Sequence, residues 1–322
     1  MIRRPPRSTR KESSAASDVY KRQVQIGKIV YTQFLNEDGG IEADITVTRL
    51  AETSYIVVTP AVTRLADQTW MTRHAFNYNV AIIDVTAGEG VLAVMGPNSR
   101  KFLNLISSAD LSNEENPFGT AQEVEIGLGL ARIHRVSFVG ELGWEIYVSA
   151  DQAGHVFEVI AEAGKDMNLK FCGMHMMDSC RIEKGFRHFG HDITCEDHVL
   201  EAGLGFAVKE TKKEFIGRSA VLKKRESGLE KRLLQFKLKE KEPLLYHNEP
   251  IVRDGEIAGY ISSGNYGHTL GGAIGMGYVS CKYQSKEEVL ESSYEIEVAG
   301  LRVEADVSLR PMYDPKAERV KS

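Results

Sequence analysis

A carboxylate in the middle of an expected strand is the first residue in this sequence that could do chemistry. Residues 41–48 alternate between apolar and polar types, so Asp44 falls on the polar face of that strand. Aspartate is disfavoured inside strands, and a strand holds a side chain more rigidly than a loop does. We therefore expect Asp44 to meet a ligand at a set distance; the plainer interpretation is a solvated strand residue.

Tyr31 lies on the other strand of the same expected β-hairpin, whose turn is rich in residues that tolerate positive φ. A four-residue loop at 36–39 would pair Tyr31 with Asp44. A five-residue loop would place Tyr31 opposite Ile45, on the other face of the hairpin. The sequence leaves both registers open, and a core or cross-strand aromatic is an equally good interpretation of Tyr31.

A second carboxylate, Glu145, lies in another expected hairpin formed by residues 128–139 and 143–148. It alternates with Trp144 and Ile146, so it faces away from that apolar pair. A carboxylate accepts two hydrogen bonds and therefore suits a heterocycle with adjacent N–H donors. The plainer interpretation is an ordinary exposed glutamate.

Arg181 follows Asp178 by three residues on an expected helix over residues 173–184. An arginine held in this way near a helix end can bind a ligand carboxylate as a fork. The plainer interpretation is a surface ion pair worth under about 1 kcal/mol. The nearby His188 and His191 have no dependable third ligand, so we expect no metal site.

The first 23 residues differ from the rest of the chain. They are basic and rich in serine, with a net charge of +5, whereas the whole chain carries −5 and residues 24–322 therefore carry −10. The segment has features of a transit peptide but resembles a translated sequencing adapter more closely. We expect a foreign or disordered head at 1–23, and a chain that is a fragment of a longer protein.

Composition excludes several classes of function. The acidic body lacks the basic face of a nucleic-acid-binding protein, and no apolar run approaches the roughly 20 residues that span a bilayer. The four cysteines form no CxxC pair, so neither a disulfide framework nor a zinc ribbon is indicated. We therefore expect no nucleic-acid partner and no membrane.

Strands and helices mix without regular βαβ alternation, which predicts an α+β fold. Strands are expected at 28–35, 41–50, 54–59, 81–85 and 91–95, and helices at 61–76, 99–105, 155–164 and 173–184. Six short strands follow at 232–239, 249–253, 256–263, 274–280, 293–298 and 301–309, which indicates a small β-barrel or sandwich. We expect one domain over 24–228 and a C-terminal β-barrel over 229–322, with the glycine-rich residues 267–277 as a barrel turn.

Several long motifs, in order, resemble the folate-dependent aminomethyltransferase superfamily, which includes the glycine-cleavage T-protein. The segments that carry the resemblance are GKIVYTQFLNEDGGIEADITVTRL, VMGPNSRKFL, VGELGWEIYV, MDSCRIEKGFRHFGHDIT, LEAGLGFAV, FIGRSAVL and PIVRDGEIAGYISSGNYGHTLGGAIGMGYV. The last, with PLLYHNEPIV and LRPMYDP, is similar to the C-terminal half of bacterial sarcosine and dimethylglycine dehydrogenases. Ala43 stands where the T-protein commonly has a second aspartate, which fits the dehydrogenase branch.

The resemblance implies a tetrahydrofolate-binding domain with the ligand in a central cavity. Asp44 matches the catalytic aspartate near the folate nitrogens, and Tyr31 matches a tyrosine that packs along the folate. Glu145 matches the glutamate that recognises the pterin ring, and Arg181 matches the arginine at the distal part of the folate. A carboxylate beside the folate amine could accept its proton or stabilise the cation that forms.

The resemblance also implies a division of labour in a longer chain. A separate N-terminal FAD domain of the full-length protein would oxidise the N-methylamine, and this portion would capture the one-carbon unit as 5,10-methylenetetrahydrofolate. The alternative is a stand-alone aminomethyltransferase of the glycine cleavage system. A folate-dependent iron–sulfur assembly factor is disfavoured, because the region of its K-G-C-Y-x-G-Q motif reads KEFIGR here. We expect the cytoplasm in a bacterium, or the mitochondrial matrix in a eukaryote.

Overall fold

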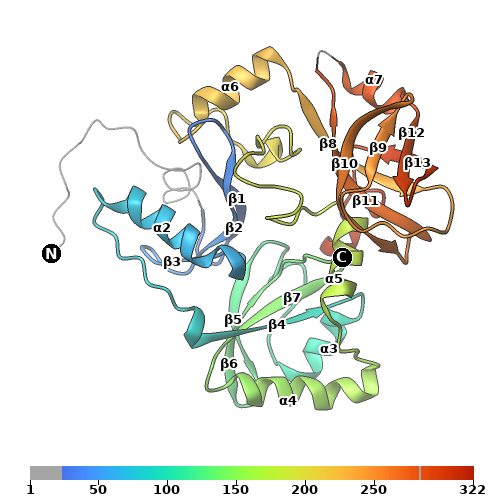
Figure 1. The fold of residues 1–322 in the computed structure, drawn as a ribbon. Helices are drawn as coiled ribbons and strands as arrows, with labels where there is room; N and C mark the ends of the chain where they lie inside the picture. Colours follow the sequence, from blue (N-terminus) through green and yellow to red (C-terminus); the bar gives the residue numbers. More distant parts are fainter. Residues whose placement is uncertain (1–23, 283) are drawn as a thin grey trace.

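The computed structural model describes residues 24–282 and 284–322, so the expectation for segment 1–23 lies outside the described residues. Three units surround the middle of the molecule (Figure 1): a three-stranded sheet, a four-stranded sheet and a closed barrel. Helix α5 (Met174–Glu183) and the C-terminal end lie between these units. The α+β class predicted from the sequence is confirmed.

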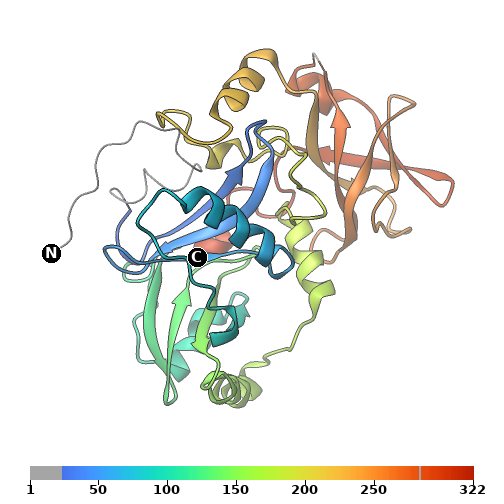
Figure 2. The same cartoon turned by 60° about the vertical axis from the view of Figure 1, so that its left-hand side comes forward.

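The first unit is an antiparallel sheet of β1 (Ile29–Leu35), β2 (Ile41–Arg49) and β3 (Tyr55–Val58), in that order. The apolar face of the hairpin packs with helix α2 (Arg64–Ala75), which lies alongside the sheet in Figure 2. The 3₁₀ turn η1 (Ala61–Thr63) precedes α2. The period-two pattern of β2 thus separates a face packed on α2 from a face left for Asp44.

The hairpin register differs from both alternatives considered for the sequence. Gln33 pairs with Asp44, and Tyr31 pairs with Thr46. The five residues 36–40 connect the strands, and a bulge between Phe34 and Leu35 shifts the pairing by one further residue. Because residue 46 is two positions from Asp44, Tyr31 lies diagonally across from Asp44 on the same face.

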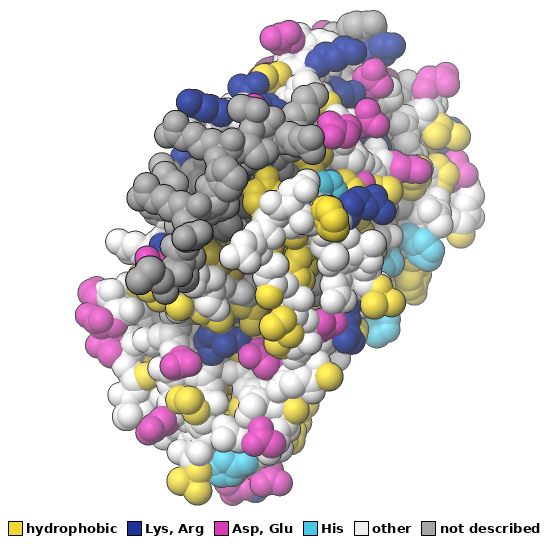
Figure 3. Space-filling model, turned by 90° about the vertical axis from the view of Figure 1, so that its left-hand side faces the viewer, with side chains coloured by type: hydrophobic (Ala, Val, Ile, Leu, Met, Phe, Trp, Pro, Cys, Tyr) yellow, Lys and Arg dark blue, Asp and Glu magenta, His cyan; other side chains and the backbone are white. Residues whose placement is uncertain are grey.

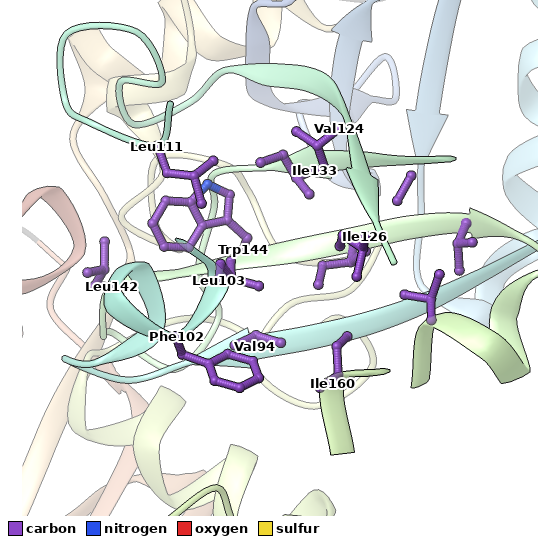
Figure 4. Packing of buried hydrophobic residues seen from close by; sticks show 14 residues of the cluster. Val94, Phe102, Leu103, Leu111, Val124, Ile126, Ile133, Leu142, Trp144 and Ile160 are labelled. Carbon is purple, nitrogen blue, oxygen red and sulfur yellow. The ribbon is translucent and has the colours of Figure 1, made fainter. Parts of the chain in front are cut away.

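The second unit is an antiparallel sheet in the order β4-β7-β6-β5. Its strands are β4 (Glu89–Met95), β5 (Ala121–Ile126), β6 (Gly129–His134) and β7 (Gly143–Ser149). Helices α3 (Ser99–Ile106) and α4 (Ala153–Gly164) cover one face, and Figure 4 shows the side chains packed between helices and sheet. Trp144 of β7 is fully buried there, and its Nε1 donates to Asn116 Oδ1 at 2.6 Å.

The elements expected for this unit differ from the observed ones in two places. Residues 81–85 form no strand, and their apolar side chains Ile83 and Val85 are largely exposed. Strand β5 was not expected at all, because its sequence AQEVEI has only two buried residues, Val124 and Ile126, beside two exposed glutamates, and so carries only a short apolar pattern. The expected pairing of 128–139 with 143–148 is confirmed by the β6–β7 ladder.

The third unit is a closed six-stranded barrel in the order β10-β11-β8-β13-β12-β9. Its strands are β8 (Lys231–Leu238), β9 (Pro250–Arg253), β10 (Glu256–Gly267), β11 (Gly272–Ser280), β12 (Tyr294–Val298) and β13 (Leu301–Ser308). Helix α6 (Arg218–Ser227) precedes the barrel, and α7 (Lys286–Glu291) and α8 (Glu318–Lys321) belong to the same C-terminal part. A Cβ at Gly277 would lie 2.4 Å from Tyr260 O, which explains why close-packed strands here need glycine.

Helix α5 joins the barrel to the rest of the molecule. Glu183 Oε1 accepts hydrogen bonds from the backbone N–H groups of Thr269 and Leu270, both at 2.8 Å. Gln235 of β8 donates to Ile182 O at 2.6 Å and to Glu183 O at 3.0 Å. These contacts are buried, so the barrel and α5 form one packed body.

The remaining short turns are η2 (Thr86–Gly88), η3 (Lys165–Met167) and η4 (Gly205–Ala207). The side of the molecule that carries α2, shown in Figure 3, presents hydrophobic side chains between charged ones. Val62, Leu65 and Phe76 are among the most exposed apolar side chains of the described residues. Among those residues, no helix is both long and apolar enough to cross a membrane.

Candidate functional site

The first cluster is built on the β1–β2 hairpin around Asp44. Gln33 Nε2 donates to Asp44 Oδ1 at 2.7 Å, straight across the ladder. The side chain of Gln33 is almost fully buried, and its Oε1 has no hydrogen-bond partner among the described residues. The hairpin therefore holds one carboxylate oxygen firmly and leaves a buried acceptor beside it unused.

Burial governs the charge of this cluster. It raises the pKa of Asp44 from an ordinary 3.8 to about 6, against the opposing effects of hydrogen bonds from Gln33 and Tyr31 and of the charge on Arg187. Burial and the negative charge of Asp44 hold the pKa of Tyr31 well above its usual 10. At neutral pH Asp44 is thus mostly ionised and Tyr31 is a phenol that can donate to it.

The Tyr31 ring also provides an aromatic surface. It stacks against Phe206 of η4, with ring centroids 6.3 Å apart and an interplanar angle of 26°. Tyr31 keeps 38% of its surface exposed and Phe206 keeps 76%. The two rings therefore form a partly exposed aromatic pair on the same face of the hairpin as Asp44. A flat ring could pack there beside Asp44.

Arg187 belongs to the same cluster and was not among the residues expected from the sequence. Its Nε donates to Ala202 O at 3.0 Å and its Nη1 to Gly185 O at 2.8 Å. Its charge acts on both Asp44 and Tyr31. The only signal in the sequence was its position six residues after Arg181, in a stretch rich in polar residues, which does not distinguish it from His188.

The second cluster surrounds Glu145 on β7. Tyr147 donates its hydroxyl to Glu145 Oε2 at 2.6 Å, and burial raises the pKa of Glu145 despite this hydrogen bond. On the neighbouring strand β6, burial and the charge of Arg132 lower the pKa of His134 to about 3, so its imidazole is neutral. Glu145 is therefore a half-buried acceptor between polar groups, on a different sheet from Asp44.

Arg181 lies apart from both clusters and is buried. Its guanidinium donates to Asp178, to Asp192, to the Phe186 carbonyl and to Ser263 Oγ. The idea that this side chain is held by an aspartate is borne out. Each of its three guanidinium nitrogens donates to a protein group, and the side chain is buried, so Arg181 is not a surface ion pair. Its binding of a ligand carboxylate stays a prediction.

A cavity of about 250 Å³ opens beside Arg181, between α5 and the barrel. Its polar lining includes His175, Asp178, His188, His191, Tyr246 and His247. The imidazoles of His188 and His191 lie 4.7 Å apart, and burial, with the charge of Arg181, lowers the pKa of His188. Within the described part of the chain, no three histidine, cysteine or acidic side chains are grouped so that they could hold a metal ion.

Two family models match the chain. The GCVT N-terminal domain matches residues 13–212, and the glycine cleavage T-protein C-terminal barrel domain matches residues 231–314. The second match coincides with the barrel strands described above. The first covers the hairpin of Asp44, the strand of Glu145 and helix α5, and it begins inside the segment 1–23.

Comparison with individual known proteins indicates the same family as the family models do. The chain is 40% identical, over 96% of its length, to 4-methylaminobutanoate oxidase (formaldehyde-forming) of Paenarthrobacter nicotinovorans, and 35% identical, over 92%, to mitochondrial sarcosine dehydrogenase of Mus musculus. It spans 37% and 34% of those two proteins, about a third of each. The crystal structure of aminomethyltransferase T from the glycine cleavage system of Bartonella henselae matches 91% of the chain, which in turn covers 78% of that structure, with 26% identity and a TM-score of 0.79. The fold, the C-terminal barrel and the order of the motifs all agree with those of these proteins. The chain therefore belongs to the aminomethyltransferase (glycine-cleavage T-protein) family.

Proposed function

We propose that this chain binds tetrahydrofolate and transfers a one-carbon unit to it, as the folate-binding portion of an N-methyl amino acid dehydrogenase or oxidase. The observation that carries the proposal is the Asp44 cluster: a carboxylate with a pKa of about 6, a phenol and an exposed aromatic stack. The unpaired Gln33 Oε1 fits a ligand that brings an N–H donor. The family and the two long relatives support this choice.

The proposed transfer of the one-carbon unit needs no oxidant. Tetrahydrofolate, which supplies two amine N–H groups, reacts with an iminium CH₂=NH⁺–R to give 5,10-methylenetetrahydrofolate, the amine H₂N–R and one proton. Two bonds form from the carbon to the folate nitrogens, and the bond from the carbon to the amine nitrogen breaks. The protein must therefore handle a cation before the transfer and a proton after it.

Asp44 is suited to both tasks. With a pKa of about 6 it is ionised at pH 7–8 and still basic enough to accept a proton from an amine that is gaining a bond. Its charge stabilises the neighbouring cation in a site where burial strengthens electrostatic effects. Gln33 fixes one of its oxygens, and the phenol of Tyr31 supports the other side of the carboxylate. We assign Asp44 the transfer role and Tyr31 a packing and orienting role.

Glu145 is proposed to recognise the pterin ring. Its Oε2 accepts from Tyr147, which leaves Oε1 for a donor on the ligand. Burial favours a partner with N–H groups, because an unpaired carboxylate is costly there. The distal part of the folate would reach the cavity beside α5, where Arg181 shapes the wall through Asp192 and Ser263. Direct binding of the ligand by Arg181 stays a prediction.

We assign the preceding oxidation to another part of a longer protein. The two relatives 4-methylaminobutanoate oxidase and mitochondrial sarcosine dehydrogenase are about three times as long as this chain. An N-terminal FAD domain would take two electrons from the N-methylamine and hand its iminium, or formaldehyde, to this portion. Sarcosine and dimethylglycine are the substrates that we propose first, because both carry an N-methyl group next to a carboxylate. The bacterial cytoplasm or the mitochondrial matrix stays our expectation for the compartment.

The second candidate is an aminomethyltransferase that takes its carbon from an aminomethyl group carried on a lipoyl protein. One observation favours it: the Bartonella aminomethyltransferase has the same fold, with a TM-score of 0.79. An aminomethylated lipoyl protein added to the chain with tetrahydrofolate would release ammonia under this alternative. Under our proposal it would not.

The experiment follows methylenetetrahydrofolate formation by the chain. Glycine and formaldehyde are mixed so that the iminium CH₂=NH⁺–CH₂–COO⁻ is present at equilibrium, and the rate is measured above the spontaneous background. We expect the catalysed rate of the Asp44→Asn variant to be about 10²-fold lower than that of the wild type, since general acid–base groups contribute at least that much. Asp306→Asn, at an exposed aspartate of barrel strand β13, should leave the rate unchanged. A folded Asp44→Asn chain with the full rate would overturn the assignment.

A further inference from the structure

We infer that Tyr147 is a positioning residue for Glu145. Its hydroxyl holds one oxygen of the carboxylate, and two side chains of strand β6 hold its ring, so that the other oxygen is offered to a ligand in one orientation. The arrangement itself stands on hydrogen bonds and ring contacts of the four-stranded sheet. Its consequence for ligand binding rests on the proposed function, in which Glu145 recognises the pterin ring.

The contact between Tyr147 and Glu145 is direct. Both residues lie on β7, two positions apart, so their side chains share one face of the sheet. The Tyr147 hydroxyl donates to Glu145 Oε2 at 2.6 Å, a distance typical of a hydroxyl bonded to a carboxylate. Glu145 Oε1 accepts no hydrogen bond from the described residues and is not among their buried unpaired atoms, so it is accessible. One oxygen is thus fixed and the other is free.

Two side chains of β6 hold the Tyr147 ring. Arg132 lies opposite Tyr147 in the β6–β7 ladder, and His134 lies opposite Glu145. The guanidinium carbon of Arg132 is 5.5 Å from the centre of the phenol ring, and the centre of the His134 ring is 4.3 Å from it. Only 5% of the surface of Tyr147 and 1% of that of His134 is exposed. The hydroxyl therefore cannot turn away from Glu145 unless packed neighbours move.

The two β6 side chains are fixed in turn. Arg132 Nη2 forms an ion pair with Glu89 Oε2 at 2.9 Å, and Arg132 Nε donates to His134 Nε2 at 3.2 Å. Because a guanidinium only donates, His134 Nε2 must be an unprotonated acceptor, and the imidazole is neutral. Glu89 lies on β4, and β7 lies between β4 and β6, so the ion pair crosses over β7. Three neighbouring strands thus contribute to the position of one phenol.

This arrangement prepares Glu145 for a ligand that donates hydrogen bonds. Trp144 and Ile146, which alternate with Glu145 and Tyr147, pack into the core of this unit, so the phenol and the carboxylate lie on the opposite face. A glutamate that is already held loses less rotamer freedom when a ligand binds. The hydroxyl of Tyr147 also favours the charged carboxylate, which accepts hydrogen bonds and donates none. The free Oε1 therefore selects a ligand with an N–H group at this position over one with an acceptor.

The first test measures tetrahydrofolate binding to the full chain by calorimetry. Tyr147→Phe keeps the ring and removes only the hydroxyl, and we expect about tenfold weaker binding, the usual effect of losing one hydrogen bond to a charged group. The control Tyr260→Phe, at an exposed tyrosine of barrel strand β10, should bind as the wild type does. In a Glu145→Ala chain, Tyr147→Phe should cause no further loss, because Tyr147 acts through Glu145. An equal loss in both backgrounds, or no loss in a folded Tyr147→Phe chain, would overturn the inference.

The second test uses no folate. An NMR titration follows the Glu145 carboxyl carbon, and Tyr147→Phe should raise its midpoint by about one pH unit, because the hydroxyl that favours the charged form is gone. The other titratable groups on this face, Glu89, Arg132 and His134, are the same in both chains. An unchanged midpoint would contradict the inference. A chain that shows the shift but binds no tetrahydrofolate would contradict the proposed function and leave the positioning of Glu145 by Tyr147 standing.

Discussion

Asp44 is ionised at neutral pH at a cost to folding stability. Its pKa is about 6 in the folded chain and an ordinary 3.8 when unfolded. Since the folded value is the higher one, the protonated form favours the folded state, and this contribution is present below pH 3.8 and lost as the pH rises through 6. The difference corresponds to about 3 kcal/mol. A site that needs a buried, charged carboxylate gives up this much stability at pH 7–8.

Replacing Asp44 by asparagine should therefore stabilise the chain. We expect Asp44→Asn to raise the free energy of unfolding by up to about 3 kcal/mol at pH 8, and by about half as much at pH 5, where the unfolded aspartate is ionised but the folded one is mostly protonated. Urea denaturation of both chains at the two pH values measures the effect. A variant that is less stable than the wild type at pH 8 would show that the charge of Asp44 does not lower the free energy of unfolding.

Residue types in strand patterns predicted where two of the candidate site residues lie. Asp44 and Glu145 were expected on polar faces of strands, and both lie on strands as half-buried acceptors with raised pKa values. Arg181 was expected near a ligand; it lines the cavity beside α5 and also donates to Asp192 and Ser263, and its contact with a ligand stays a prediction. Arg187 escaped prediction, because the carbonyls and the glycine beside it approach it only in the folded chain.

At the scale of elements, the β1–β2 hairpin depends on a tight fit between its turn and the segment 195–198. A Cβ at Gly40 would lie 2.0 Å from Cys195 O, a backbone atom that cannot move without its neighbours. Asn36 closes the turn from inside, since its Oδ1 accepts from the N–H groups of Asp38 and Gly40. The position of Asp44 therefore depends on a turn four residues away.

Gly40→Ala should displace this turn. We expect a loss of about 1–3 kcal/mol in the free energy of unfolding, the usual cost of forcing extra atoms into a packed site. Gly154→Ala is the matched control: nothing lies within 4 Å of its added Cβ in helix α4, and alanine should stabilise that helix by about 0.4–1 kcal/mol. Thermal or urea unfolding compares the two. Equal stability of the Gly40→Ala chain and the wild type would mean that the turn adjusts freely.

Local patterns predicted most elements but not their exact pairing. All six barrel strands and the helices α2 to α5 were expected near their observed positions, because each has a clear apolar period or a glycine at its end. The hairpin register escaped prediction, since a bulge between Phe34 and Leu35 has no marker such as glycine in the sequence. The false strand at 81–85 shows the opposite error, an apolar run that finds no neighbouring strand.

At the scale of the whole molecule, α5 couples the barrel to the units that carry Asp44 and Glu145. Glu183 is buried and accepts two backbone N–H groups of the β10–β11 turn. The expected domain boundary at 228/229 thus separates two sequence regions whose folded forms share a polar, buried junction. We expect such a junction to make the two regions unfold together rather than one after the other.

Glu183→Ala should weaken this junction. Two backbone donors would lose their acceptor, so we expect a loss of about 2–4 kcal/mol and a separation of the unfolding of the barrel from that of the rest. Glu183→Gln keeps an acceptor oxygen and should lose less than half as much. Calorimetric unfolding of the three chains tests this. A Glu183→Ala chain with the stability and single transition of the wild type would contradict the coupling.

Titration calorimetry of the full chain with tetrahydrofolate is the most direct measurement of whether this protein is a folate-binding, one-carbon transfer unit. We predict saturable binding of one folate per chain. Binding should be weakened by Glu145→Gln, which removes the charged acceptor proposed for the pterin ring, and largely retained by Asp44→Asn, which removes the transfer residue. A folded chain that gives no binding heat with tetrahydrofolate at any temperature tried, and no competition with a folate analogue, would contradict the proposed function.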